Sequence, residues 1–362
     1  MKGIFTTILF LAVALLVEAQ TLWRDDDRSR IPTFDREGIA PNTVVNVYKS
    51  TTVMDNILNS RTTEEELYAN VQFDDRARPL EIIIKTPESD YPFHKTIYSY
   101  KTDDTFTVTL FRGDEKLFHK WHVVDSVLVA EESYVGEKLR FRWKYRAEDD
   151  FTVDEKFKGS GKLIRVAIMK KDSMDADARY CVYERKKLMK MSLYRLNETG
   201  NPERVELLDA DDLNRAANKL HVDRKDLAEF DAERIRMALT GLTYYWNFEY
   251  SENDELTKQI VFDPHSQEVG MVRYFRDENG TIERVIADAE IASEIPWYRF
   301  YDDLAGLFDT KAIYYYQGLE LLNVDNRTLH DLKGRPAESI FEYVGYKVGG
   351  RRVTYRYEYF PE

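Results

Sequence analysis

The sequence predicts an α+β protein that is mainly antiparallel β, built as curved sheets or partly open barrels with a few packed helices. Three observations predict this class. Short segments of alternating apolar and polar residues recur along most of the chain, turn residues separate them, and helical spacing dominates only in the middle. A chain of 362 residues is also long enough to bury a core without disulfide bonds.

The amino-terminal segment predicts export. Lys2 precedes an apolar run over residues 4–17, and Ala19 supplies the small residue at which signal peptidase cuts. A membrane-spanning helix needs about 20 apolar residues, whereas this run is shorter and is followed directly by charged residues. We therefore expect a signal peptide over residues 1–19, a flexible arm over 20–43, and a secreted, extracellular product without a transmembrane anchor.

Three glycan acceptor patterns agree with an extracellular glycoprotein. Asn197, Asn279 and Asn326 each begin an Asn-x-Thr triplet in polar, turn-like surroundings, where a bulky sugar fits outside the fold.

Residues 44–208 are predicted to form a first β-rich domain. Between Glu81 and Met169 the pattern is that of a β-meander, in which Phe106, Val108 and Leu110 alternate with threonines. Thr63 followed by Glu66 three residues later matches a capping box and predicts a short helix before the meander.

Residues 209–362 are predicted to contain a helical pair followed by a second β-rich domain. Apolar residues recur at helical spacing between residues 213 and 239, with Asp223 as an N-cap and Gly241 as a helix stop. Strand patterns resume at Leu242, and Pro296 is predicted to open a further helix.

The carboxyl-terminal segment predicts a hairpin. Gly349-Gly350 forms its two-residue turn, and Val344 then lies opposite Tyr355. Tyr343-Val344-Gly345 repeats Tyr134-Val135-Gly136, which suggests two related halves.

Charge and cysteine usage limit the function. The formal net charge of −13 argues against nucleic-acid binding, which requires a positive surface field. Cys181 is the single cysteine, so no intrachain disulfide forms. It is interpreted as a small buried hydrophobic residue, with an intermolecular disulfide as the alternative.

One strand pattern predicts an anionic partner. Alternate residues of a strand point to opposite faces, so one face of residues 138–146 carries a row of basic side chains. These are Lys138, Arg140, Arg142, Lys144 and Arg146. The row favours lipid headgroups, sulfated glycans or an acidic protein as the partner. Pairing with carboxylates on neighbouring strands is the structural alternative.

The chain also contains 24 tyrosines and 19 phenylalanines, which are typical of strands and can line a groove. The sequence therefore favours a non-enzymatic binding protein. Its ligand is apolar or amphipathic, held by the concave aromatic side of a sheet, with its anionic group contacting the basic row.

Two other functions stay open. Arg112-Gly113-Asp114, in a predicted turn, is the tripeptide of integrin-binding proteins and indicates adhesion or protein interaction. A secreted hydrolase with a carboxylate acid/base pair is the second alternative. No nucleophile motif, phosphate-binding glycine loop or metal-ligand spacing is present, so no cofactor or metal is predicted, and His119 and His122 face opposite ways in a strand.

Overall fold

The fold is taken from a computed structural model of the chain. It describes residues 38–56, 59–85, 93–112, 116–148, 151–171, 177–277, 282–289, 310–316, 319–345 and 349–361. The predicted signal peptide, most of the predicted arm and the helix expected from Pro296 lie outside these residues.

Strands make up most of the described chain. They are β1 (Thr43–Asn56), β2 (Asn59–Thr62), β3 (Glu66–Phe73), β4 (Pro79–Ile84), β5 (Phe93–Tyr100), β6 (Phe106–Arg112), β7 (Leu117–Val124), β8 (Val127–Val135), β9 (Lys138–Glu148), β10 (Phe151–Lys158), β11 (Leu163–Lys171), β12 (Asp177–Glu184), β13 (Lys187–Leu196), β14 (Pro202–Leu208), β15 (Tyr245–Tyr250), β16 (Leu256–Phe262), β17 (Glu268–Arg276), β18 (Ile282–Ala289), β19 (Thr310–Tyr316), β20 (Leu319–His330), β21 (Pro336–Gly345) and β22 (Gly349–Pro361).

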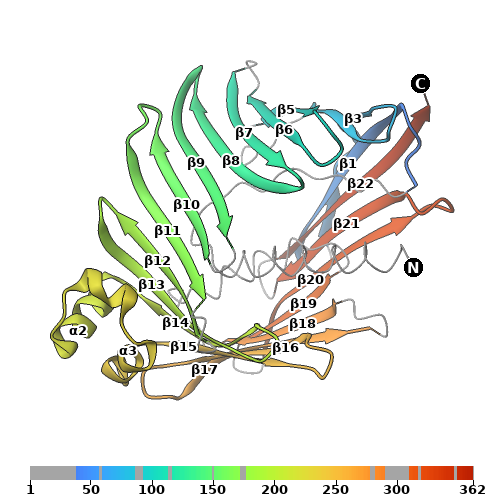
Figure 1. The fold of residues 1–362 in the computed structure, drawn as a ribbon. Coiled ribbons are helices and arrows are strands. Elements are labelled where there is room, and N and C mark those ends of the chain that lie inside the picture. The colour runs from blue at the N-terminus through green and yellow to red at the C-terminus, as the bar shows by residue number, and fades with distance from the viewer. Residues whose placement is uncertain are drawn as a thin grey trace, which may run out of the picture.

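These strands form one strongly curved sheet in which chain neighbours pair (Figure 1). From β3 to β22 each strand pairs with the next, and every such pair is antiparallel except β18 with β19. β1 pairs with β3 on one side and with β22 on the other, so the two ends of the strand series meet. The prediction of a mainly antiparallel β protein is confirmed.

Helices occupy one short stretch of the described chain, so the α+β label holds only loosely. They are α2 (Ala210–Leu220), the 3₁₀ helix η1 (Arg224–Glu229) and α3 (Ala232–Leu239), and they lie outside the curve of the sheet, next to β13 and β14 (Figure 1). Their apolar residues pack on Cys181, Met191 and Leu193 of the sheet. No helix in the described part of the chain has the length and apolarity that crossing a membrane requires.

The register defines two faces of the sheet. Cys181 packs beneath the helices, and its cross-strand partner Ile168 is followed on the next strands by Val153 and Arg146. Because directly paired residues point to the same side of a sheet, this series marks the outer face. The neighbouring series through Val182, Ala167, Asp154 and Tyr145 marks the inner face.

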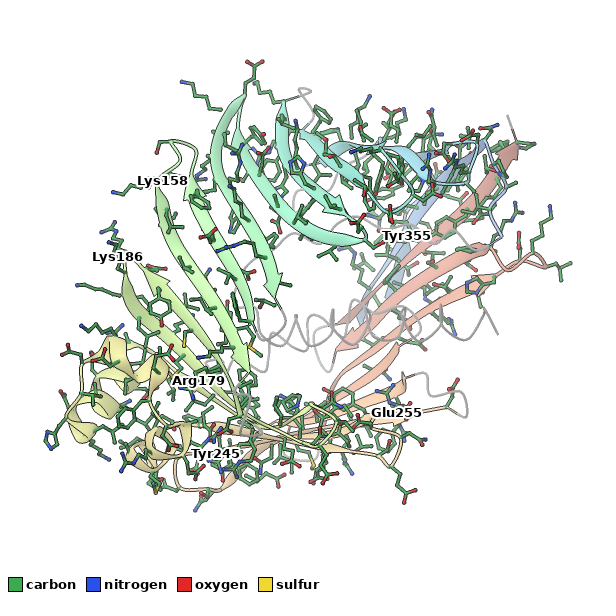
Figure 2. The ribbon with its side chains drawn as sticks, viewed as in Figure 1. Lys158, Arg179, Lys186, Tyr245, Glu255 and Tyr355 are labelled. Carbon is green, nitrogen blue, oxygen red and sulfur yellow. The ribbon has the colours of Figure 1, made fainter. Side chains whose placement is uncertain are left out.

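Figure 2 shows Arg179 on the helix-bearing side of β12, where its guanidinium donates to the carbonyl oxygens of Ala228 and Phe230.

The capping residues differ in part from the sequence prediction. Asp209 caps α2 in a reciprocal capping box with Asp212, and Asp231 caps α3. Asp223 precedes η1 but makes no capping hydrogen bond with its side chain. Gly241, two residues after the end of α3, has the positive φ expected of a helix stop.

The helix predicted at Thr63–Glu66 is wrong. These residues lead from β2 into β3, and the Thr63 hydroxyl bonds to the backbone of Thr51 instead of capping a helix. Glu65 forms an ion pair with Arg356 of β22. Side chains that would cap a helix are therefore used between strands.

The carboxyl-terminal hairpin is confirmed, but its predicted register is wrong. Gly349 and Gly350 belong to β22, where they pair with Gly345 and Val344 of β21. Tyr355 accordingly lies opposite Ser339 and packs on the rings of Phe341 and Tyr68.

The proposed division of the chain at residue 208/209 falls between β14 and α2, yet β14 pairs with β15, so the sheet continues across it. The two domains, and the two related halves, stay predictions.

Candidate anion-binding surface

The basic row of β9 lies on the outer face and is open to solvent. Its five members are all exposed: Lys138, Arg140, Arg142, Lys144 and Arg146. The residues between them point to the inner face, where Phe141 and Trp143 are half-buried and Tyr145 is buried. The alternation expected from the sequence is therefore present in the strand.

Neighbouring carboxylates neutralise only part of this row. Arg142 binds Glu132 of β8 through two nitrogens at 2.7 and 2.8 Å, and Arg146 lies 3.6 Å from Glu155 of β10. Lys138, Arg140 and Lys144 have no carboxylate partner among the described residues. The Lys144 ammonium lies 5.5 Å from the ring centre of Phe157 on β10.

Glu132 is the acidic residue most closely tied to the row. Burial would raise the pKa of its carboxyl, but hydrogen bonds from Tyr134 and Arg142 outweigh this and lower it. Burial and the carboxylate of Glu132 together raise the pKa of Tyr134 to about 12. Arg142 is thus the member of the row whose charge is most closely matched.

The inner face beneath the row holds a buried polar cluster. Glu131 accepts a hydrogen bond of 2.8 Å from the Tyr145 hydroxyl, and its other oxygen lies 3.2 Å from Nε2 of His119. The His119 ring lies 4.5 Å from that of Trp121, whose indole nitrogen has no hydrogen-bond partner among the described residues. His122 faces the outer side near Thr107 and Glu132, so the two histidines do point opposite ways.

The two parts of the expected ligand site thus lie on opposite faces of one strand. The aromatic residues of β9 face inward, whereas the basic residues face outward. A single small ligand cannot contact the aromatic and the basic residues at once, because the sheet lies between them. The basic row is therefore a separate surface.

The adhesion tripeptide is described only at its first residue. Arg112 ends β6, and its guanidinium lies 4.3 Å from the ring centre of Phe118. Its backbone N–H donates to the carbonyl oxygen of Lys116 at 3.0 Å. Gly113 and Asp114 lie outside the described residues.

Of the three glycan acceptors, Asn197 lies in the turn after β13, and its side-chain oxygen accepts hydrogen bonds from the backbone of Thr199 and Asn201. Asn326 pairs on both sides within strand β20, so the turn-like surroundings expected for it are wrong, and Asn279 falls outside the described residues.

Cys181 is 4% exposed and free, packed among the apolar residues under the helices. Burial raises the pKa of its thiol to about 11. The interpretation as a small buried hydrophobic residue fits this environment.

A second group of charged residues escaped the sequence analysis. Arg195, Arg204, Glu206 and Arg236 come together on the outer face between β13, β14 and α3. These residues are far apart along the chain, and no motif joins them. The one available signal was Arg236, a charged residue on the apolar side of a helix that also buries Ala232, Ile235 and Leu239.

Comparisons with known proteins place the chain in no family. No family model and no curated protein matches it. Among solved structures, a porin-like protein from Bacteroides uniformis is 9% identical over 87% of this chain and 97% of its own, with a TM-score of 0.27. A porin-like protein from Bacteroides vulgatus is 9% identical, covering 87% and 98%, with a TM-score of 0.25. Transferrin Binding Protein B from Haemophilus parasuis Hp5 is 7% identical, covering 89% and 76%, with a TM-score of 0.17. Likenesses this distant carry no argument about function.

Proposed function

We propose that the protein is a non-enzymatic binding protein that holds a linear polyanion, a sulfated glycan, along the outer face of β9. The observation that carries the proposal is the exposed basic row, in which three of five charges have no carboxylate partner among the described residues. The anionic part of the ligand expected from the sequence is kept, and the apolar part is not needed at this surface.

The spacing of the row suits a repeating anion. Residues two apart on a strand are separated by about 7 Å, so Lys138 and Arg146 lie about 27 Å apart along β9. A flexible chain with sulfate groups at regular intervals meets successive basic residues without bending the sheet. Unmatched like charges in a row also repel one another, and a bound polyanion removes this repulsion.

The width of the row favours a chain over a flat surface. On either side of β9 the outer face carries acidic residues, Glu132 on β8 and Glu155 on β10. A membrane of anionic headgroups would approach these carboxylates as well as the row, whereas a single linear chain follows the row alone. The predicted extracellular location favours a sulfated glycan over a nucleic acid.

The test is binding to a sulfated polysaccharide such as heparin, measured by calorimetry at low and at physiological salt. The triple variant Lys138→Glu, Arg140→Glu, Lys144→Glu is expected to lose at least 100-fold in affinity at low salt, because the three charges without a carboxylate partner change from attractive to repulsive. Wild-type affinity should fall steeply with salt, as for any interaction that displaces counterions.

The matched control reverses three exposed lysines elsewhere: Lys101, Lys186 and Lys225. It changes the net charge by the same amount and should lose less than threefold. Equal losses in both variants, with both folded by circular dichroism, would mean that net charge rather than the row governs binding. Equally tight binding of a single-stranded oligonucleotide would contradict the choice of a sulfated glycan.

A further inference from the structure

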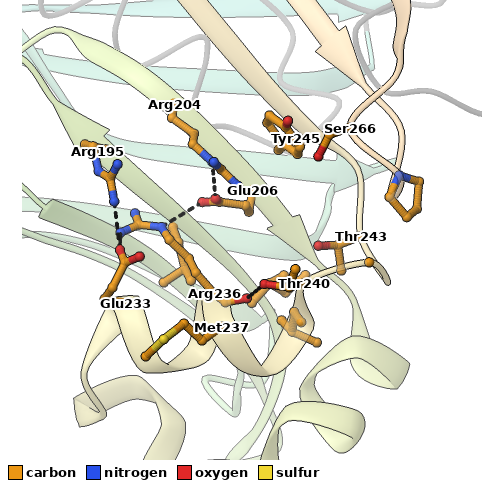
Figure 3. Close-up of a pocket in the computed structure, with 15 residues that line it drawn as sticks. Arg195, Arg204, Glu206, Glu233, Arg236, Met237, Thr240, Thr243, Tyr245 and Ser266 are labelled. Carbon is orange, nitrogen blue, oxygen red and sulfur yellow. Dashed lines mark hydrogen bonds and ion pairs between the residues drawn. The ribbon is translucent and has the colours of Figure 1, made fainter.

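The outer face contains a cavity of about 240 Å³ at the foot of α3 (Figure 3). Its floor is formed by β13, β14 and β15 and its wall by α3. Its rim is formed by Thr240, Gly241 and Thr243 and by the turn that carries Pro264 and Ser266. A water molecule takes up about 30 Å³ in the liquid, so the volume suits a small organic molecule rather than a single ion.

Arg236 is the buried polar group of this cavity. Its side chain is 6% exposed, and its Nε lies 3.2 Å from Glu206 while Nη1 lies 3.0 Å from Asp177 and 3.3 Å from Glu233. Its Nη2 is buried and has no hydrogen-bond partner among the described residues. Because leaving a buried N–H without an acceptor is unfavourable, an oxygen placed against this nitrogen gains more free energy than it would at a solvated site.

Two further arginines face each other across the floor. Arg195 and Arg204 are direct cross-strand partners, an arrangement that is destabilising for like charges unless it is compensated. Arg195 pairs with Glu233 at 2.7 Å and Arg204 with Glu206 at 2.6 Å (Figure 3). The Arg204 guanidinium also stacks over the Tyr245 ring at 4.0 Å, which fixes its plane at the side of the cavity.

The charges of this group are balanced. Arg195, Arg204 and Arg236 are matched by Asp177, Glu206 and Glu233. Without an excess of positive charge, the cavity does not suit a multiply charged anion. It suits a singly charged group that uses the free guanidinium N–H donors, and a planar carboxylate matches the fork of an arginine.

Apolar side chains complete the lining and set the rest of the ligand. Leu208 and Leu239 are buried at the floor and wall, and the Tyr245 ring, stacked on Phe262, closes one side. A ligand that fits therefore has a carboxylate at one end and a short apolar body at the other.

We propose that this cavity is a binding site for a small apolar carboxylate. The carboxylate accepts hydrogen bonds from Nη2 of Arg236 and from the terminal nitrogens of Arg204, and its apolar body lies against Leu208, Leu239 and Tyr245. The site shares no residue with the basic row of β9, so it stands or falls independently of the polyanion proposal.

The experiment is calorimetric titration of the full chain with benzoate and with unbranched carboxylates of increasing length, and with sulfate for comparison. Benzoate should saturate one site, and sulfate should bind at least tenfold more weakly. Affinity should rise roughly fourfold for each added methylene until the cavity is full.

Two variants test the site without leaving a buried carboxylate unpaired. Arg204→Gln removes a donor while Glu206 keeps Arg236, and is expected to lower affinity at least tenfold. Thr243→Trp places a large ring at the half-buried rim and should abolish binding. Arg234→Gln is the matched control on α3, because Arg234 lies outside the lining and over Phe230.

The proposal is supported if both cavity variants lose benzoate while Arg234→Gln keeps it and all three unfold at the wild-type temperature. It is overturned if the wild type shows no saturable binding of any carboxylate up to about 10 mM, the order of concentration at which a weak small-ligand site fills. It is also overturned if Arg204→Gln and Thr243→Trp bind benzoate as well as the wild type does.

Discussion

The outer face of the sheet has two contrasting regions. Over β12–β14 it lies beneath α2, η1 and α3, and its residues are apolar and buried, with Cys181, Met191 and Leu193 all below 5% exposure. Over β9 the same face carries exposed basic side chains. Both regions are built from strands with the same alternation, so the covering layer decides which residue types occupy one face.

The same contrast separates the two candidate sites. The cavity at α3 buries Arg236 among carboxylates that match it, with the partly exposed Arg195 and Arg204 beside it, whereas the row on β9 leaves three of its charges to solvent. Buried charges require nearby partners because desolvation is costly, while exposed charges tolerate being unmatched because water screens them. Single substitutions in each region test this contrast.

The largest effect is expected for Leu213→Ala in the covered region. Leu213 is fully buried between α2 and the sheet, so truncation should lower the free energy of unfolding by about 2–5 kcal/mol. Urea unfolding followed by circular dichroism measures this loss. Met237→Ala on α3, which is 62% exposed, is the control and should change stability by less than about 0.5 kcal/mol. Similar losses in both variants would show that the helices do not shield a core.

The second-largest loss of stability is expected at alkaline pH, in the region covered by the helices. The thiol of Cys181 has a pKa of about 11 in the folded protein, against 9.0 as its ordinary value. Unfolding therefore releases a proton between these pH values, and stability falls as pH rises from 9 to 11, by at most about 3 kcal/mol. Cys181→Ala should remove this part of the pH dependence whatever constant cost the substitution carries. Parallel stability curves for the two proteins above pH 9 would contradict the buried environment of the thiol.

A smaller effect is expected at the start of α2. Asp209 accepts hydrogen bonds from the backbone of Asp211 and Asp212, so Asp209→Ala should cost about 1 kcal/mol. Asp223→Ala is the matched control, because Asp223 precedes a helix without capping it, and should be close to neutral. Urea unfolding compares the two, and a greater loss for Asp223→Ala would reverse the assignment of the caps.

The smallest change in stability is expected on the open surface. Arg140→Gln should alter the free energy of unfolding by less than about 0.5 kcal/mol, since the side chain is exposed and has no carboxylate partner among the described residues. Its affinity for heparin should nevertheless fall about two- to fivefold at low salt. A clear loss of stability would mean that the row is structural, and the comparison between the two regions would fail.

Local patterns accounted for much of the fold. Alternation in residues 106–110 predicted a strand that is buried at Val108 and Leu110, and helical spacing between 213 and 239 predicted the helical segment. Local pattern does not predict which strands pair with one another or in which register. Thr63 and Glu66 match a capping box, yet in the structure Thr63 bonds to Thr51 of β1 and Glu66 pairs with Lys49 of the same strand. The hairpin at Gly349 was recognised, but its register depends on the length of the connection and on how Tyr355 packs.

The same limit applies to the sites. The row on β9 follows from one strand and was found from alternation alone. The cavity gathers Arg195, Arg204 and Arg236 from two strands and a helix, and their meeting depends on the β13–β14 register and on the placement of α3. A site within one element is visible in a sequence, whereas a site assembled between elements is not.

The pairing of β1 with β22 affects how the protein is made. Twelve residue pairs join strands about 300 positions apart, from Thr43 with Pro361 to Met54 with Gly350. At a synthesis rate of about 5–20 residues per second, one edge of β1 waits about 15–60 s for its partner. An unpaired strand edge is a template for association with other chains, so substitutions that delay β22 should reduce the yield of the protein before they reduce the stability of the folded form.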